Sequence, residues 1–296
     1  MNLARGATIV LVTVVAAGAC KHDPKPSTAS ADSVSPTATP AKCASPALRT
    51  TVEPGLTVDR YLAPLASSAG VGDRCVTIVR IDPTKLALEL HTAQVEGGSR
   101  TAPAWAKDAK LVAVINASMY GEDRRSVGLL VSGPVTNNGS DNHKFGGFFA
   151  WDPVNAGAPP VVSVGRDCAG FDLARLRTEY RSVVQNYRLL DCERKPIAWQ
   201  DPKLFSAAVL GTDRKGNVVF IHARTPYSMT ELAKILAAPE LDLDTAMHVE
   251  GGPEASLWVS GAVSEMGSFE TGFLADDKND TFWSIPNVLG VTHKTQ

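Results

Sequence analysis

The sequence has 296 residues, of which 44% are apolar and 20% charged, close to the average of soluble globular proteins. Its 29 basic and 31 acidic residues leave a formal net charge of −2, so no broad positive field exists to hold nucleic acid or an anionic membrane surface. The composition therefore argues against a nucleic-acid partner and allows a large buried core.

Residues 1–20 have the pattern of an export signal. Arg5 precedes an apolar run from Gly6 to Ala19, which is shorter than the roughly 20 residues that a membrane-spanning helix needs. Small residues directly before Cys20 resemble the lipobox of bacterial lipoproteins, although Ala17 stands where leucine is usual. We expect export with lipidation at Cys20 and a membrane anchor in the cell envelope; the alternative is plain secretion.

Residues 21–42 are predicted to be a disordered tether, because they combine four prolines with many Ser, Thr and Ala residues and cannot form a core. Residues 43–296 follow as one folded domain, or as two closely packed halves. Its four cysteines, Cys43, Cys75, Cys168 and Cys192, suit two disulfides in an oxidising compartment. Four cysteines can be connected in three ways, and the sequence does not choose between them. In one of these, Cys43 with Cys75 and Cys168 with Cys192, each bond would close a nearby loop.

Short apolar runs rich in β-formers predict a sizeable sheet. The expected strands are residues 75–81, 86–92, 111–116, 127–131, 161–164, 205–210 and 218–223. Thr101 can cap a helix that begins near Pro103, and Ser228 with Glu231 forms a capping box before a second helix. We expect an α+β or α/β fold with one large mixed β-sheet and a few packed helices.

Two segments place polar side chains at the ends of predicted strands, where reactive groups are often held. LVAVINASMY brings Asn116 to a strand end, and an amide can both donate and accept hydrogen bonds. HVEGGPEASLWV brings Glu250 to another end beside Gly251 and Gly252, where a carboxylate can activate water or hold a sugar hydroxyl. The alternatives are a turn or glycosylation role for Asn116 and a solvated turn position for Glu254.

A third segment, VVFIHARTPYS, places His222 and Arg224 at alternate strand positions and so on one face. Arg224 could bind a phosphate with two hydrogen bonds, whereas the alternative is a core histidine and a surface ion pair. The sequence contains no P-loop, G-x-S-x-G, H-E-x-x-H or dinucleotide-binding pattern.

These segments resemble the phosphodiester glycosidase family over most of residues 75–291. NASMY at 116–120 is similar to the family's Asn-Gly-Gly-Phe-Phe element, and residues 127–130 to the Val-Gly strand after it. The stretch from Ala208 to Leu236 follows the family's order of strand, turn, strand and Met-Thr-x-x-Glu-Leu helix, while VEGGPEAS is similar to its Asp-Gly-Gly-Gly-Ser-Ser-Thr motif. Residues 183–190 resemble the segment that places Gln185 and Asn186 at the site.

The resemblance implies hydrolysis of a sugar 1-phosphodiester, and we predict no cofactor. It makes Glu250 and Asn116 the catalytic candidates. The substrate-binding candidates are Tyr120, Gln185, Asn186, Ser206, His222, Arg224, Gly251 and Gly252. Carboxylates and amides could bind a divalent cation such as calcium, but no calcium-ligand loop is recognisable, so no metal ligand is predicted.

Two departures from the family pattern open other interpretations. Glu250 replaces the commoner Asp, and the Arg often found before the strand at Ala208 is absent; Arg224 and Lys203 are the nearby candidates to supply that charge. One alternative is a non-catalytic envelope lipoprotein that binds cell-surface glycan; another is a structural or adhesive domain, whose polar residues would not converge on one site.

Overall fold

The computed structural model describes residues 43–268 and 279–294, which belong to a compact unit spanning Ala41–Gln296. The predicted signal peptide, Cys20 and the tether lie on residues 1–42, outside the described residues. Within the described ranges, no helix has the length and apolar character to cross a bilayer.

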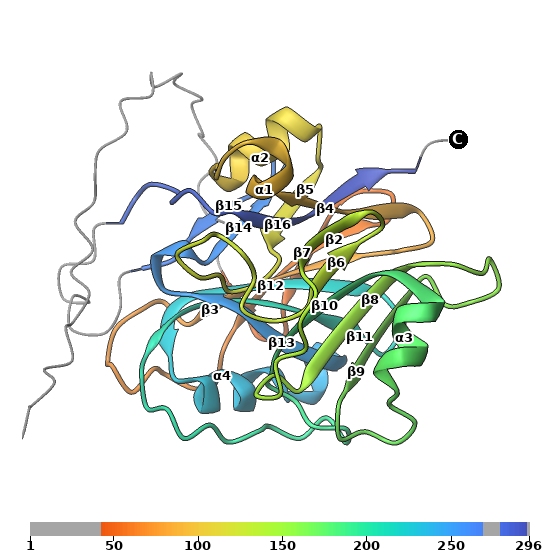
Figure 1. Ribbon diagram of the computed structural model, residues 1–296. Helices are drawn as coiled ribbons and strands as arrows, with labels where there is room; N and C mark the ends of the chain where they lie inside the picture. Colours follow the sequence, from red (N-terminus) through yellow and green to blue (C-terminus); the bar gives the residue numbers. More distant parts are fainter. Residues whose placement is uncertain (1–42, 269–278, 295–296) are drawn as a thin grey trace, which may run out of the picture. The chain divides into compact units, whose positions relative to one another are not determined.

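The larger of two sheets contains eleven strands and forms the centre of the unit (Figure 1). Its main path runs β1 (Leu48–Glu53), β2 (Leu56–Leu62), β3 (Cys75–Ile81), β12 (Val218–Tyr227), β11 (Phe205–Asp213), β13 (Leu243–Gly251), β10 (Tyr180–Arg188), β6 (Leu130–Ser132) and β7 (Val135–Asn138). Strand β8 (Gly147–Pro153) pairs with β10 and with β9 (Val161–Gly165). Strands far apart in the sequence therefore meet at the middle of this sheet.

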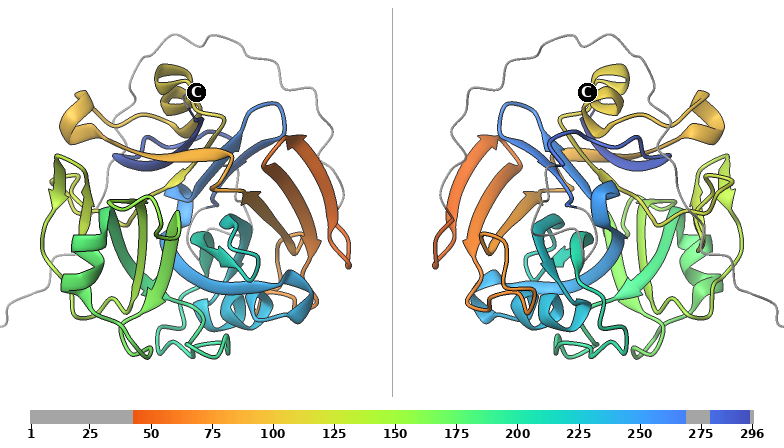
Figure 2. Two further views of the ribbon diagram at one scale, coloured as in Figure 1. Left: turned by 90° about the vertical axis from the view of Figure 1, so that its right-hand side faces the viewer. Right: turned by 90° about the vertical axis from the view of Figure 1, so that its left-hand side faces the viewer.

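The smaller sheet has five strands and lies over one face of the larger sheet (Figures 1 and 2). Its order is β15 (Val263–Met266), β14 (Ser256–Val259), β5 (Ala113–Asn116), β16 (Asn287–His293) and β4 (Leu86–Thr92). Helices α1 (Ala93–Glu96) and α2 (Ala102–Ala109) cover its outer side, whereas α4 (Met229–Leu236) lies beneath the larger sheet. Helix α3 (Leu173–Glu179) precedes β10 directly.

The main core lies between the two sheets and is built from strand residues such as Leu210, Phe220 and Leu257. A second core fills the space between the larger sheet and α4, where Val209, Ile221 and Leu232 are fully buried. Because both faces of the central strands are covered, β11 and β12 are buried almost throughout. The central strands thus form a rigid frame for the side chains at their ends.

The local predictions agree with the structure where the sequence signal is local. Strands β3 and β4 have the predicted bounds, Thr101 caps α2 by accepting from Ala104 N, and Ser228 and Glu231 form the capping box of α4. The prediction of one large mixed sheet is wrong in two respects. The strands form two sheets, and every pairing between named strands is antiparallel. Sheet pairing joins distant segments, so periodicity within one segment does not reveal it.

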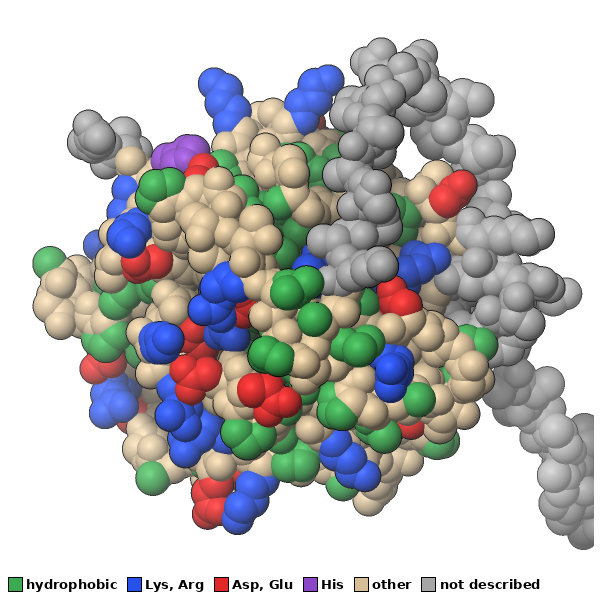
Figure 3. Space-filling view, turned by 180° about the vertical axis from the view of Figure 1, so that it is seen from behind, with side chains coloured by type: hydrophobic (Ala, Val, Ile, Leu, Met, Phe, Trp, Pro, Cys, Tyr) green, Lys and Arg blue, Asp and Glu red, His purple; other side chains and the backbone are tan. Residues whose placement is uncertain are grey.

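The described cysteines form two disulfides, Cys43–Cys75 and Cys168–Cys192, which are the two local pairings. The first joins the segment before β1 to the first residue of β3, and the second joins the β9–α3 connection to the β10–β11 connection. Acidic and basic side chains are interspersed on the face seen in Figure 3, in keeping with the near-neutral net charge.

Candidate functional site

Glu250 lies near the C-terminal end of β13, a central strand of the larger sheet. In its pairing with β11, Glu250 lies opposite Ala208 and His248 lies opposite Val209, so Val249 is an extra residue that makes a β-bulge. Paired residues share a face of the sheet. The bulge therefore turns Glu250 toward the core between the two sheets, where Ala208 is buried, and leaves His248 on the opposite face.

The chain turns sharply after Glu250 through two glycines. Gly252 has a φ of +67°, a conformation that side chains other than glycine rarely adopt, and it begins a 3₁₀ turn over Gly252–Glu254. A Cβ on Gly251 would come within 2.6 Å of the Phe205 ring. The backbone N–H of Gly251 donates to Glu250 Oε1 at 3.0 Å, which orients the carboxyl group.

Asn116 clamps this turn from the neighbouring sheet. Its Nδ2 donates to the carbonyl of Glu254 at 3.0 Å, and its Oδ1 accepts from the backbone N–H of Ser256 at 2.8 Å. The residue is almost fully buried at the end of β5, which rules out the glycosylation interpretation in the folded state. Both polar groups of the amide are thus used to position the turn that follows Glu250.

Two acidic side chains and a tyrosine share this region. Burial raises the pKa of Glu250 well above its ordinary value; the hydrogen bond from Gly251 opposes the shift, and the nearby charge of Glu254 adds to it. Burial also raises the pKa of Tyr120, and the charges of Glu250 and Glu254 contribute. The charges of these side chains therefore influence the ionisation of their neighbours in the group. Glu254, for which a solvated turn position was the alternative, belongs to the same group.

Asn186 on β10 has a buried polar atom to which the described residues offer no hydrogen bond. Its Nδ2 donates to the carbonyl of Ala117 at 3.2 Å, two residues before Met119 and three before Tyr120. Its Oδ1 is buried and has no hydrogen-bond partner among the described residues. A buried acceptor without a partner is unfavourable by about 1–3 kcal/mol, so a water molecule or a ligand hydroxyl is expected to reach it.

Gln185 points into a loop instead of toward Glu250. Its Nε2 donates to Asp141 Oδ1 and to the carbonyls of Asn142 and Phe145, while its Oε1 accepts from backbone N–H groups. The side chain is completely buried. Its hydrogen bonds hold the loop before β8, and they leave the amide with no capacity for a substrate.

Ser206 and Arg224 are also engaged with the protein. The Ser206 hydroxyl donates to the carbonyl of Arg224 at 2.5 Å and contacts Ser268 Oγ at 2.8 Å. The Arg224 guanidinium donates to the carbonyls of Met266 and Asn279 at 2.7 and 2.8 Å. Arg224, which was predicted to bind the substrate phosphate, therefore donates to backbone carbonyl oxygens in this structure.

His222 lies in the core beneath the turn that carries Glu254. Its Nε2 is 3.3 Å from the carbonyl of Ala255, and its Nδ1 is 3.0 Å from Glu265 Oε2. Burial alone would raise the pKa of Glu265, but the hydrogen bond with His222 and the charges of His222 and Arg60 hold it below its usual value. His222 thus supports the turn from below. No local sequence signal marks Glu265, because its partners come from other strands.

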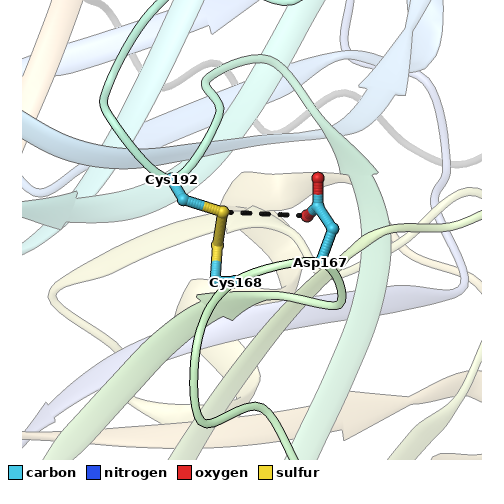
Figure 4. Close-up of side chains that lie close together, drawn as sticks. All are labelled: Asp167, Cys168 and Cys192. Atoms are coloured by element: carbon cyan, nitrogen blue, oxygen red, sulfur yellow. Dashed lines mark hydrogen bonds between the residues drawn. A yellow bond between two sulfur atoms is a disulfide. The ribbon is translucent and has the colours of Figure 1, made fainter.

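A group of donor atoms elsewhere has the spacing of a metal site but not its chemistry. Asp167, Cys168 and Cys192 have ligand-type atoms within 4.8 Å of one another. Figure 4 shows that the two sulfur atoms form a disulfide, and the Asp167 carboxylate is paired with Arg188. Neither cysteine can therefore supply the thiolate that a metal ion would bind. A cavity of about 310 Å³ lies beside this disulfide, at the opposite end of β13 from Glu250.

Comparison with known proteins was informative at the level of family and fold. Residues 109–292 match the model of the family described as phosphodiester glycosidase. No curated protein sequence matches the chain.

Two solved structures share the fold at 13% sequence identity. The zebrafish N-acetylglucosamine-1-phosphodiester alpha-N-acetylglucosaminidase catalytic domain, auto-inhibited by its pro-peptide, matches with a TM-score of 0.58 over 83% of this chain and 86% of that one. A hypothetical protein from Synechocystis matches with a TM-score of 0.53 over 84% of this chain. The chain spans 64% of the Synechocystis protein.

Proposed function

Because the chain belongs to the phosphodiester glycosidase family, we propose that it hydrolyses a sugar 1-phosphodiester at the glycosidic C–O bond. The observation that carries the proposal is the placement of Glu250. This carboxyl group lies at the end of a central strand, is oriented by Gly251 N–H, and shares its surroundings with Glu254 and Tyr120.

In the proposed reaction, water attacks the anomeric carbon and gives a proton to the Glu250 carboxylate. The bond between the anomeric carbon and oxygen breaks, and its electron pair stays on the phosphate oxygen. A phosphomonoester is already a stable anion, so it leaves with little need for the proton that ordinary glycosidases supply to an alkoxide. The raised pKa makes the Glu250 carboxylate a stronger base toward the attacking water.

The other residues are assigned by the hydrogen-bonding capacity that they have left. Asn186 Oδ1 is proposed to bind the substrate because it lacks a hydrogen-bond partner among the described residues. The Tyr120 hydroxyl is proposed to do so because the charge of Glu250 contributes to its raised pKa, which places the two groups near each other. Asn116 and Gln185 are proposed to act on loop and turn geometry. His222 and Arg224 are proposed to hold the frame around the Gly251–Ala255 turn.

We also propose that the protein is exported and acts in the cell envelope, anchored through a lipid on Cys20. The two disulfides support export, because such bonds persist in oxidising compartments. Metabolic labelling with a radioactive fatty acid would test the anchor. Label in the wild type and none in the Cys20→Ser variant is expected; unlabelled wild-type protein in the medium would contradict it.

The central experiment is release of free sugar from a panel of sugar 1-phosphodiesters. The Glu250→Gln variant is expected to lose at least about 100-fold in kcat/KM, since a general base contributes roughly that factor or more. The exposed Glu193 supplies the control Glu193→Gln, which should retain wild-type activity. No sugar release from any substrate, with glycan binding retained, would support the non-catalytic binding protein instead.

A further inference from the structure

Five rings form a continuous row on the face of the larger sheet opposite Glu250. The ring centroids are separated by 4.3 Å from Phe145 to Tyr187, 4.9 Å from Tyr187 to Trp199, 5.9 Å from Trp199 to His248 and 5.5 Å from His248 to Phe205. These residues come from a loop, β10, the β10–β11 connection, β13 and the start of β11. Tyr187, Trp199 and Phe205 are partly exposed.

The row ends at the same glycine turn as the candidate catalytic group. A Cβ on Gly251 would lie 2.6 Å from the Phe205 ring and 3.3 Å from His248 Nε2. The N–H of Gly251 donates to Glu250. The backbone of Gly251 thus lies between the Glu250 carboxyl group, to which it donates, and the Phe205 end of the aromatic row.

His248 carries an unmet hydrogen-bonding requirement. The residue is only 3% exposed, and neither Nδ1 nor Nε2 has a hydrogen-bond partner in the described part of the chain. Burial lowers the pKa of His248 to about 4, so the ring is neutral at physiological pH and offers one donor and one acceptor. A buried polar group left unpaired is unfavourable by about 1–3 kcal/mol.

The chemistry of this row favours an uncharged ligand. A phosphate requires a cation or several N–H donors to offset its desolvation, whereas the row offers aromatic rings and a neutral imidazole. Sites of this kind bind apolar surface and fix its orientation through a few polar contacts. A sugar ring provides a C–H face for the aromatic side chains and a hydroxyl, at once donor and acceptor, for the imidazole.

We propose that Tyr187, Trp199, Phe205 and His248 form a subsite for a neutral sugar ring, adjoining the turn that holds Glu250. The rings of Trp199 and Phe205 pack edge-on against the His248 ring, which is only 3% exposed, so these two side chains shift when the ligand enters. The proposal deepens the proposed function, because it names the part of the substrate that this face binds and assigns specificity to residues outside the catalytic group.

Binding is tested on the full chain carrying Glu250→Gln, so that turnover does not remove the ligand. The probes are methyl glycosides of glucose, galactose, mannose and N-acetylglucosamine, with inorganic phosphate as competitor, and affinity is measured by titration calorimetry. At least one glycoside is expected to bind, without competition from phosphate. Trp199→Ala should weaken that binding by about 10-fold, the effect of losing one well-placed aromatic contact.

His248→Phe fills a similar space without ring nitrogens, and it should weaken binding while the melting temperature is retained. Trp258→Phe, a partly exposed tryptophan of the smaller sheet, is the control and should leave the affinity unchanged. Imidazole ¹⁵N signals that are absent in His248→Phe should shift when the glycoside is added to the parent chain.

The proposal is overturned if no glycoside binds, if binding survives both Trp199→Ala and His248→Phe, or if phosphate competes. The outcome is independent of catalysis, because binding is measured in a chain that lacks the Glu250 carboxylate. Failure of the wild type to release sugar would refute the proposed hydrolysis and leave a positive binding result intact. Conversely, sugar release with a KM unaffected by Trp199→Ala would refute the subsite alone.

Discussion

The side chain of Glu250 is held where its negative charge is unfavourable. The hydrogen bond from Gly251 N–H to its carboxyl group opposes the effect of burial and of the Glu254 charge, which together raise its pKa. An enzyme gains a stronger base near neutral pH from such an arrangement, while the folded state loses stability when the group ionises.

A pH dependence of stability follows from this residue. Because the pKa of Glu250 is higher in the folded than in the unfolded chain, the folded state binds more protons above the ordinary value of 4.5. Its contribution to stability is therefore full below that value and is lost as the pH rises through the folded-state pKa. The Glu250→Gln variant should melt at a higher temperature than the wild type at pH 8 and at the same temperature at pH 4. Equal melting temperatures at pH 8 would contradict the prediction.

Asn116 is expected to affect stability as well as activity. Asn116→Ala removes the acceptor of the Ser256 N–H and one of the donors to the Glu254 carbonyl in a buried position, which should reduce the free energy of unfolding by about 2 kcal/mol. Urea denaturation measures the loss, and the exposed Asn155 supplies the control Asn155→Ala, which should have no effect. If Asn116→Ala kept full stability and lost only activity, the residue would be a substrate ligand rather than a clamp.

At the scale of elements, the β-bulge at Val249 separates two chemistries on one strand. Without it, alternation would place His248 and Glu250 on the same face. With it, Glu250 joins Tyr120 and Glu254 on the face toward the smaller sheet, and His248 joins Trp199 and Phe205 on the opposite face. Bulges commonly redirect side chains next to active sites.

Helix α4 provides a prediction about an element remote from Glu250. Ser228 Oγ accepts from Glu231 N at 3.2 Å, and the Glu231 carboxylate accepts from Ser228 N at 2.8 Å. Ser228→Ala should lower the free energy of unfolding by about 1 kcal/mol, the usual effect of losing an N-cap. Urea denaturation would measure it, and kcat/KM should not change. An unchanged midpoint would show that helix packing alone determines the start of α4.

At the scale of the whole molecule, the two disulfides cross-link segments that adjoin strands of the larger sheet. Cys168 and Cys192 are separated by 24 residues, and closing a loop of that length stabilises the fold by about 3 kcal/mol through the unfolded chain. The Cys168→Ser, Cys192→Ser double variant should therefore unfold at a lower urea concentration than the wild type. Thiol titration of native protein should find neither cysteine reactive; two reactive thiols there would contradict the pairing.

The sequence by itself determined several features of this protein because their causes are local. Alternating and continuous apolar runs predicted β3, β4 and the start of β12, and the Ser228–Glu231 box predicted α4. The glycines after Glu250 marked a strand end that carries a carboxylate, and their order with NASMY carried the family resemblance that the match over residues 109–292 confirmed.

Only the tertiary structure decided which polar side chains remain available to a ligand. Gln185 and Arg224 find their hydrogen-bond partners in segments about 40 residues away along the chain, and His222 finds Glu265 on the other sheet. The bulge at Val249 comes from pairing with β11. Trp199 contacts His248 from the β10–β11 connection, whose sequence has no hydrophobic periodicity that would predict the contact. A sequence encodes how one segment folds, whereas the partners of a buried polar group depend on which distant segments the whole fold brings beside it.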